Sequence, residues 1–170
     1  MTESRTDRNT LALAGLRIAV GLLFLIFGQY KVFGTEFVAK SFEGWIHRFL
    51  ENGAYPFMAP VLRDFVLRYP TPIAYFVAYG ELAIGLGLVL GLAVRPASIA
   101  GLVYMLALLF SANHPGPDAA FWQYFGASLE HLVLALCFLA FAVGDPARAL
   151  SVGVWLERRR AGMPPPESLP

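Results

Sequence analysis

The sequence predicts an all-α integral membrane protein: a polytopic four-helix bundle with short amphipathic helices beside it. Hydrophobic residues make up 57% of the 170 residues, and the mean hydropathy is +0.58. Charged residues make up 15%, whereas an ordinary soluble domain contains about 25%. A soluble domain of this size could not bury so much apolar surface. Because each segment in lipid must satisfy its own backbone hydrogen bonds, the apolar segments are expected to be helices.

Four apolar segments have a length suited to crossing a bilayer, which takes about 17–25 helical residues. They are expected at residues 11–33, 73–94, 96–112 and 126–143. The first segment is too long for the apolar region of a signal peptide, and no small-x-small cleavage site follows it. We therefore expect this segment to be a retained transmembrane helix.

The distribution of basic residues predicts the orientation of the bundle. Residues 11–156 are expected to form one membrane domain, between a polar N-terminus (1–10) and a basic, then Pro-rich, tail (157–170). Arginine gathers near both termini and in the turn after the second segment: Arg5, Arg8, Arg95, Arg148, Arg158, Arg159 and Arg160. The loop 113–125 has no Lys or Arg, and acidic residues dilute the Lys and Arg of the long loop 34–72. Basic loops stay inside, so both termini are predicted to be cytoplasmic.

The long loop 34–72 is expected to be helical. Its apolar residues recur at helical spacing opposite charged ones, first around Trp45 and Ile46 and again over residues 58–69. After the fourth segment, Asp145-Pro146 is typical of a helix start, and a short helix with Leu150, Val154 and Trp155 is expected to follow. Helices with one apolar and one charged face lie in the membrane interface or cap a bundle.

Ionisable side chains inside the segments are the candidate functional residues, because a charge in a bilayer core is costly. At 1.5 Å per residue, Glu81 is about 12 Å along the second segment and Glu130 and His131 are about 6–8 Å along the fourth, all measured from the outer side. Lys31 and Gln29 end the first segment on that same side, whereas Arg17 lies toward the inner side. Five polar residues are thus expected to share the outer half of the bundle.

One face of the first segment is expected to point inward, because Arg17, Gly21, Gly28 and Lys31 fall within about 80° of one another. Glu81 could form a structural ion pair with Lys31, or it could be a carboxylate that carries protons or binds a ligand.

The other candidate residues could also have either a structural or a functional role. Glu130 is shallow enough to reach water, and His131 could bridge two helices or relay protons. Arg17 could be an anchor at the inner face or a ligand-binding residue.

Several classes of function are excluded by composition. The net charge of +1 argues against nucleic-acid binding. The single cysteine, Cys137, excludes an internal disulfide and a CxxC redox pair. Only His131 lies at membrane depth, so a bis-histidine haem is not expected, and no metal site is recognised. Any redox chemistry would therefore depend on a bound molecule or on a partner.

Short motifs in three segments resemble the DoxX family of small four-helix bacterial membrane proteins. They are Phe27-Gly28-Gln29-Tyr30-Lys31 in the first segment, Gly80-Glu81-Leu82-Ala83-Ile84-Gly85 in the second, and Glu130-His131 with the later Gly144-Asp145-Pro146 in the fourth. The resemblance covers residues 11–156 apart from the long loop. A His often precedes the glycine of the first motif in that family, whereas this sequence has Phe27.

The resemblance implies a bacterial inner-membrane protein linked to the quinone pool, since relatives are subunits of a thiosulfate:quinone oxidoreductase. The leading hypothesis is a quinone-linked oxidoreductase subunit without an intrinsic cofactor. Glu81, His131 and Glu130 would then be the catalytic candidates, and Lys31, Gln29 and Arg17 the ligand-binding ones. The alternatives are a non-enzymatic anchor or assembly subunit for a redox protein, and a small transporter or lipid-binding protein. The expected partners are membrane lipid, quinone and a redox protein.

Overall fold

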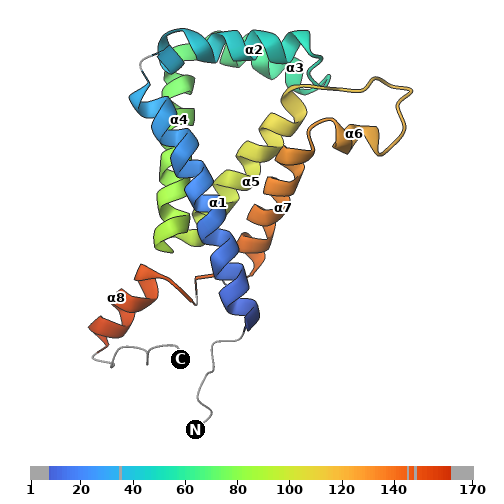
Figure 1. The fold of residues 1–170 in the computed structure, drawn as a ribbon. Helices are drawn as coiled ribbons and strands as arrows, with labels where there is room; N and C mark the ends of the chain where they lie inside the picture. Colours follow the sequence, from blue (N-terminus) through green and yellow to red (C-terminus); the bar gives the residue numbers. More distant parts are fainter. Residues whose placement is uncertain (1–7, 35, 145, 148, 162–170) are drawn as a thin grey trace.

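The computed structural model describes residues 8–34, 36–144, 146–147 and 149–161 (Figure 1). All regular secondary structure in these ranges is helical, and none of these residues belongs to a strand. The all-α prediction is therefore confirmed for the part of the chain that the structure describes. The predicted helix start at Asp145 lies outside the described residues.

The four longest helices form two pairs. Helix α1 (Arg8–Phe33) packs along α4 (Pro70–Leu90), and α5 (Val94–Ser111) packs along α7 (Leu129–Val143). The pairs approach each other at the end near α8 (Val152–Arg160) and separate toward the opposite end (Figure 1). Helices α1, α4 and α5 are long and apolar enough to cross a membrane, whereas α7 is a shorter apolar helix.

A hydrophobic core joins the two pairs on the α8 side. It consists of Val20, Phe24, Ile84, Leu88, Val94, Met105, Ala135, Phe138 and Phe141. Small residues let α1 and α4 approach closely, as expected for helices that associate in lipid. A Cβ atom added to Gly28 would lie 2.8 Å from the backbone nitrogen of Leu82, and one added to Gly85 would lie 2.9 Å from the carbonyl oxygen of Gly21.

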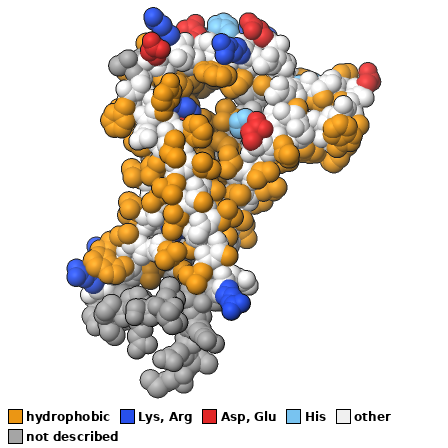
Figure 2. Space-filling view, viewed as in Figure 1, with side chains coloured by type: hydrophobic (Ala, Val, Ile, Leu, Met, Phe, Trp, Pro, Cys, Tyr) orange, Lys and Arg blue, Asp and Glu red, His pale blue; other side chains and the backbone are white. Residues whose placement is uncertain are grey.

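The separated ends of the pairs are covered by a layer of short helices, which we call the α2 layer (Figure 1). It contains η1 (Phe37–Ser41), α2 (Phe42–Glu51), α3 (Met58–Pro60) and η2 (Val61–Val66). Its apolar face forms a second core around the buried residues Phe42, Ile46, Leu62 and Ala74. Figure 2 shows charged side chains on its outward face and mostly hydrophobic side chains along the long helices below. The predicted helical character of the long loop is confirmed.

Several helix boundaries differ from the prediction. Helix α4 ends at Leu90 rather than at residue 94, because Gly91 has a φ of 69° and ends the helix in a left-handed conformation. Helix α5 begins at Val94 rather than at residue 96, so Pro96 lies within its first turn, where the missing N–H of proline is not needed. Helix α8 begins at Val152, later than expected, after Leu150 with a φ of 51°.

Candidate binding site

Three polar side chains from three helices meet between the two apolar cores. Lys31 of α1 forms an ion pair with Oε1 of Glu81 of α4, and the hydroxyl of Tyr104 of α5 donates a hydrogen bond of 2.5 Å to the same oxygen. Glu81 is only 5% exposed. We call these residues the carboxylate cluster. The Lys31–Glu81 ion pair, one of the two alternatives considered for Glu81 from the sequence, is present.

The close contact at Gly28 explains why Lys31 reaches Glu81. A side chain at position 28 would collide with the backbone of residues 81 and 82, so only a glycine lets α1 lie directly against that turn of α4. Lys31 follows one turn later on the same face of α1. The buried positions of Arg17, Gly21 and Gly28 confirm that the predicted face of α1 points inward.

A row of aromatic rings lies next to the carboxylate cluster. The ring centroids of Phe24 and Phe138 are 5.1 Å apart, and those of Phe24 and Tyr104 are 6.5 Å apart, both in edge-to-face geometry. Phe24 therefore connects α1 to both α5 and α7. We call Phe24, Tyr104 and Phe138 the aromatic floor.

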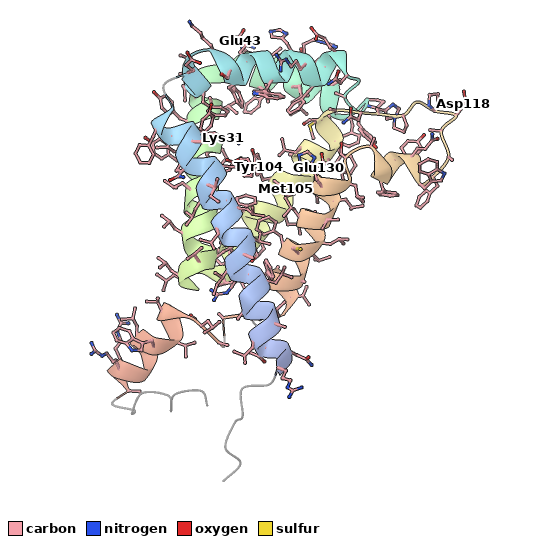
Figure 3. All side chains as sticks on the ribbon, viewed as in Figure 1. Lys31, Glu43, Tyr104, Met105, Asp118 and Glu130 are labelled. Carbon is pink, nitrogen blue, oxygen red and sulfur yellow. The ribbon has the colours of Figure 1, made fainter. Side chains whose placement is uncertain are left out.

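Lys31 and His131 lie on the two sides of the space above this floor. Lys31 lies about two helical turns beyond Phe24 on α1, and His131 lies about two turns beyond Phe138 on α7, each on the same helix face as the phenylalanine. Figure 2 shows a hollow beneath the α2 layer, with a Lys or Arg side chain at one edge and a His beside an acidic side chain at the other. Figure 3 places Lys31, Tyr104 and Glu130 around the same space.

Two buried polar atoms beside the hollow have no hydrogen-bond partner among the described residues: Oε2 of Glu81 and Nδ1 of His131. Nδ1 lies 3.2 Å from Oε1 of Glu130, but the angles are not those of a hydrogen bond. A buried polar atom without a partner costs about 1–3 kcal/mol. Both atoms are closed off from solvent, so the surrounding side chains would have to move slightly before either atom could gain a partner.

The other predicted site residues lie apart from the carboxylate cluster. Gln29 is exposed on the surface of α1. The Glu130 side chain is 69% exposed and lies at the edge of the hollow (Figure 3). Arg17 lies near the α8 end, far along α1 from Lys31. Of the predicted candidates, the structure brings together Lys31 and Glu81, with His131 across the hollow.

Arg17 binds backbone carbonyls rather than acidic side chains. Its guanidinium donates to the carbonyl of Leu88 at 2.6 Å and to that of Leu150 at 2.7 Å, and its side chain is fully buried. The hydroxyl of Ser151 donates to the carbonyl of Gly91 at 3.0 Å. Arg17 therefore satisfies a carbonyl at the C-terminus of α4 and joins it to the segment after α7.

Tyr104 is the residue that sequence reasoning missed. Sequence reasoning does not single out Tyr104, because a tyrosine within an apolar helix carries no charge that would mark it as costly in lipid. A signal existed, because a buried tyrosine hydroxyl usually finds a hydrogen-bond partner. Among the described residues no group of three His, Cys, Asp or Glu side chains could hold a metal ion.

These features define a multi-pass integral membrane protein with a polar cluster in an apolar bundle. The sequence model of the DoxX family matches residues 12–114, and the chain belongs to that family. The matched range contains most of α1, all of α4 and α5, and the three residues of the carboxylate cluster, but not Glu130 or His131. No curated protein and no solved structure matches the chain.

Proposed function

We propose that this protein is a quinone-linked subunit of a membrane oxidoreductase. Electrons would pass from a reduced sulfur compound, or from a partner protein, to a membrane quinone bound in the hollow. The observation that carries the proposal is the carboxylate cluster, which lies beside an aromatic floor and between two apolar cores. The link to quinone itself comes from the DoxX family, and a shared family is support by analogy.

The residues around the hollow suit a quinone headgroup. Its ring would lie against the aromatic floor, and its apolar tail would extend among the lipid-facing side chains. Lys31 uses one donor on Glu81, and an ammonium group has three, so it retains donors for one carbonyl oxygen. His131, across the hollow, would bind the other carbonyl.

Reduction of a quinone to a quinol consumes two electrons and two protons, so the site must deliver protons as well as hold the ring. Glu81 is the proposed proton carrier, because a carboxylate oxygen can accept a proton and pass it on. His131 is the proposed second proton donor, since its imidazole ring carries an N–H group. The electrons come from the sulfur compound or the partner.

We further propose the topology in which this chemistry takes place. Helix α7 would cross the membrane with α1, α4 and α5, although it is shorter than they are. The α2 layer would lie at the outer surface of a bacterial inner membrane, and both termini would lie in the cytoplasm. α2 and α8 would rest in the membrane interface, where their aromatic and basic side chains are favourable.

The test is quinone binding and reduction by the purified protein. Lipids that copurify with it are identified by mass spectrometry, and decylubiquinone reduction is then followed with thiosulfate or sulfide as the donor. We expect quinone to copurify with the protein, and we expect the Glu81→Gln variant to reduce decylubiquinone much more slowly than the unmodified protein. Glu43→Gln is the matched control, because Glu43 is an exposed carboxylate of α2. An unchanged rate in Glu81→Gln would remove Glu81 from the mechanism.

A second candidate function is a non-enzymatic anchor for a redox protein. The observation in its favour is a depression of about 380 Å³ on the outward face of the α2 layer, lined by Lys40, Ser41, Gly44, Trp45 and Arg48. Basic and aromatic side chains of this kind suit a protein contact. Lys40→Glu with Arg48→Glu would release a copurifying partner under this hypothesis, while quinone binding would stay unchanged.

A further inference from the structure

We infer that the molecule bound in the hollow is an uncharged amphiphile that reaches it sideways from the bilayer, through the gap between α1 and α7. Phe27 lies at the edge of this gap. The inference rests on the proposed function and deepens it, because it names the access route and the charge of the ligand. Three observations carry it: two closed ends, one open side and a balanced pair of charges.

The α2 layer closes one end of the hollow. Main-chain hydrogen bonds join the layer to the end of α5 and to the loop that follows α5, although the layer continues directly from α1 and into α4. These bonds are Asn113 N–H to Asn52 O at 3.2 Å, His114 N–H to Gly53 O at 2.8 Å, and Tyr55 N–H to Phe110 O at 3.1 Å. The layer is therefore tied to both helix pairs and spans the space between them (Figure 1).

Tyr55 completes this closure. Its ring packs in edge-to-face geometry against Phe110 and His114, with centroids 5.2 Å and 4.7 Å away. Its hydroxyl donates a hydrogen bond of 2.8 Å to the carbonyl of Tyr124. A molecule arriving from the water beyond the α2 layer would have to break this packing.

The opposite end is closed by the first apolar core. Phe138 and Phe141 are fully buried there, and Gly101 of α5 is so close to Phe138 that an added Cβ atom would lie 2.3 Å from its ring. Arg17 adds hydrogen bonds beneath this core. No route leads along the bundle axis through packing of this density.

The side between α1 and α7 is open. The two helices touch at Phe24 and Phe138, and the pairs to which they belong separate toward the α2 layer (Figure 1). Phe27 lies one turn beyond Phe24 on the side of α1 that faces α7, and it is 60% exposed. Figure 2 shows the hollow on this side, between hydrophobic surfaces.

The charges around the hollow favour a neutral molecule. The positive charge of Lys31 is already neutralised by Glu81, and Glu130 adds an acidic side chain at the edge (Figure 3). An anion bound to the free donors of Lys31 would bring an uncompensated negative charge into the apolar bundle beside Glu81, which is strongly unfavourable. It would also have to cross the apolar rim. A reduced sulfur anion is therefore expected to react elsewhere, on a partner or on the outward surface.

Site-directed spin labelling in lipid vesicles tests this inference. The labels are placed at Phe27→Cys, at Ile26→Cys on the lipid-facing side of α1, and at Glu43→Cys on the α2 layer, each in a Cys137→Ser background. All three native side chains are largely exposed, so the substitutions should be tolerated. We expect labels 26 and 27 to collide more with oxygen, which partitions into lipid, than with a water-soluble nickel chelate. Label 43 should show the reverse.

Adding ligands then tests the access route and the charge of the ligand separately. Decylubiquinone should reduce the mobility and the oxygen collisions of label 27 and leave labels 26 and 43 unchanged, whereas sodium thiosulfate should change none of them. The access route is wrong if decylubiquinone binds by calorimetry but acts on label 43 or leaves label 27 unchanged. The charge argument is wrong if thiosulfate immobilises label 27. If decylubiquinone does not bind at all, the proposed function fails and the inference fails with it.

Discussion

Lys31 and Glu81 form an ion pair across the contact between α1 and α4, although they are separated by 50 residues in the sequence. Neither charge could remain in an apolar bundle without the other, because a buried charge must be paired or hydrogen-bonded. The pair is thus both a structural link between the helices and the centre of the proposed site. The following predictions separate these two roles.

The ion pair should show strong coupling in a double-mutant cycle. Lys31→Met and Glu81→Leu should each destabilise the protein by about 3–5 kcal/mol, because each leaves an unpaired buried charge. The double variant should be more stable than either single variant, since an apolar pair restores neutrality. Thermal unfolding in detergent measures the three variants. Additive losses in the double variant would contradict a paired state of these residues.

Tyr104→Phe should weaken the site without unfolding the bundle. The substitution removes one hydrogen bond to Glu81, which is expected to cost about 0.5–1.5 kcal/mol, and keeps the ring of the aromatic floor. Quinone reduction should fall because the carboxylate of Glu81 is held less firmly. Tyr79→Phe, an exposed tyrosine of α4, is the control and should match the unmodified protein in rate.

Gly28→Ala should separate α1 from α4 and break the carboxylate cluster. The added methyl group would lie 2.8 Å from the backbone nitrogen of Leu82, and the backbone cannot move aside as a flexible side chain could. The variant should therefore lose both thermal stability and quinone reduction. Gly15→Ala is the matched control in the same helix, since an added Cβ atom meets nothing within 4 Å there. Equal behaviour of the two variants would argue against the close contact.

Arg17→Met should reduce stability but leave the affinity for quinone unchanged. The guanidinium satisfies the carbonyls of Leu88 and Leu150, and losing these bonds should cost about 1–3 kcal/mol. Thermal unfolding measures the loss of stability, and quinone titration measures the affinity for quinone. Arg8→Met serves as the control because Arg8 is exposed. A weaker affinity for quinone in Arg17→Met would favour the ligand-binding role considered from the sequence.

The packing of Tyr55 against Phe110 and His114 should weaken at alkaline pH. Burial, and then the proximity of Tyr124, raise the pKa of the Tyr55 hydroxyl above its usual value. Because the pKa of Tyr55 is raised in the folded state, the neutral hydroxyl contributes to the free energy of unfolding below the ordinary tyrosine pKa. This contribution is lost as the pH rises through the pKa of the folded state. Unfolding temperatures should therefore fall in this range more steeply for the unmodified protein than for Tyr55→Phe. Parallel curves would show that Tyr55 does not ionise within its packing.

The inward face of α1 could be predicted from the sequence because it depends on helical periodicity alone. Arg17, Gly21, Gly28 and Lys31 share a face whatever lies next to them. The same reasoning located the helical pattern of the α2 layer. Sequence reasoning misplaced the end of α4, because both Gly91 and Pro96 are residues that can interrupt a helix. The structure shows that Gly91 ends α4, whereas Pro96 lies within α5.

The sequence by itself determined the class of this protein: an apolar, all-helical membrane chain with a few ionisable residues inside its helices. Only the tertiary structure decided which of these residues meet. Tyr104 binds Glu81 because α5 lies beside α4, and Arg17 binds carbonyls because α4 ends next to it. Periodicity specifies which side of a helix turns inward, but the neighbouring helix and its register follow from side-chain packing across the whole bundle.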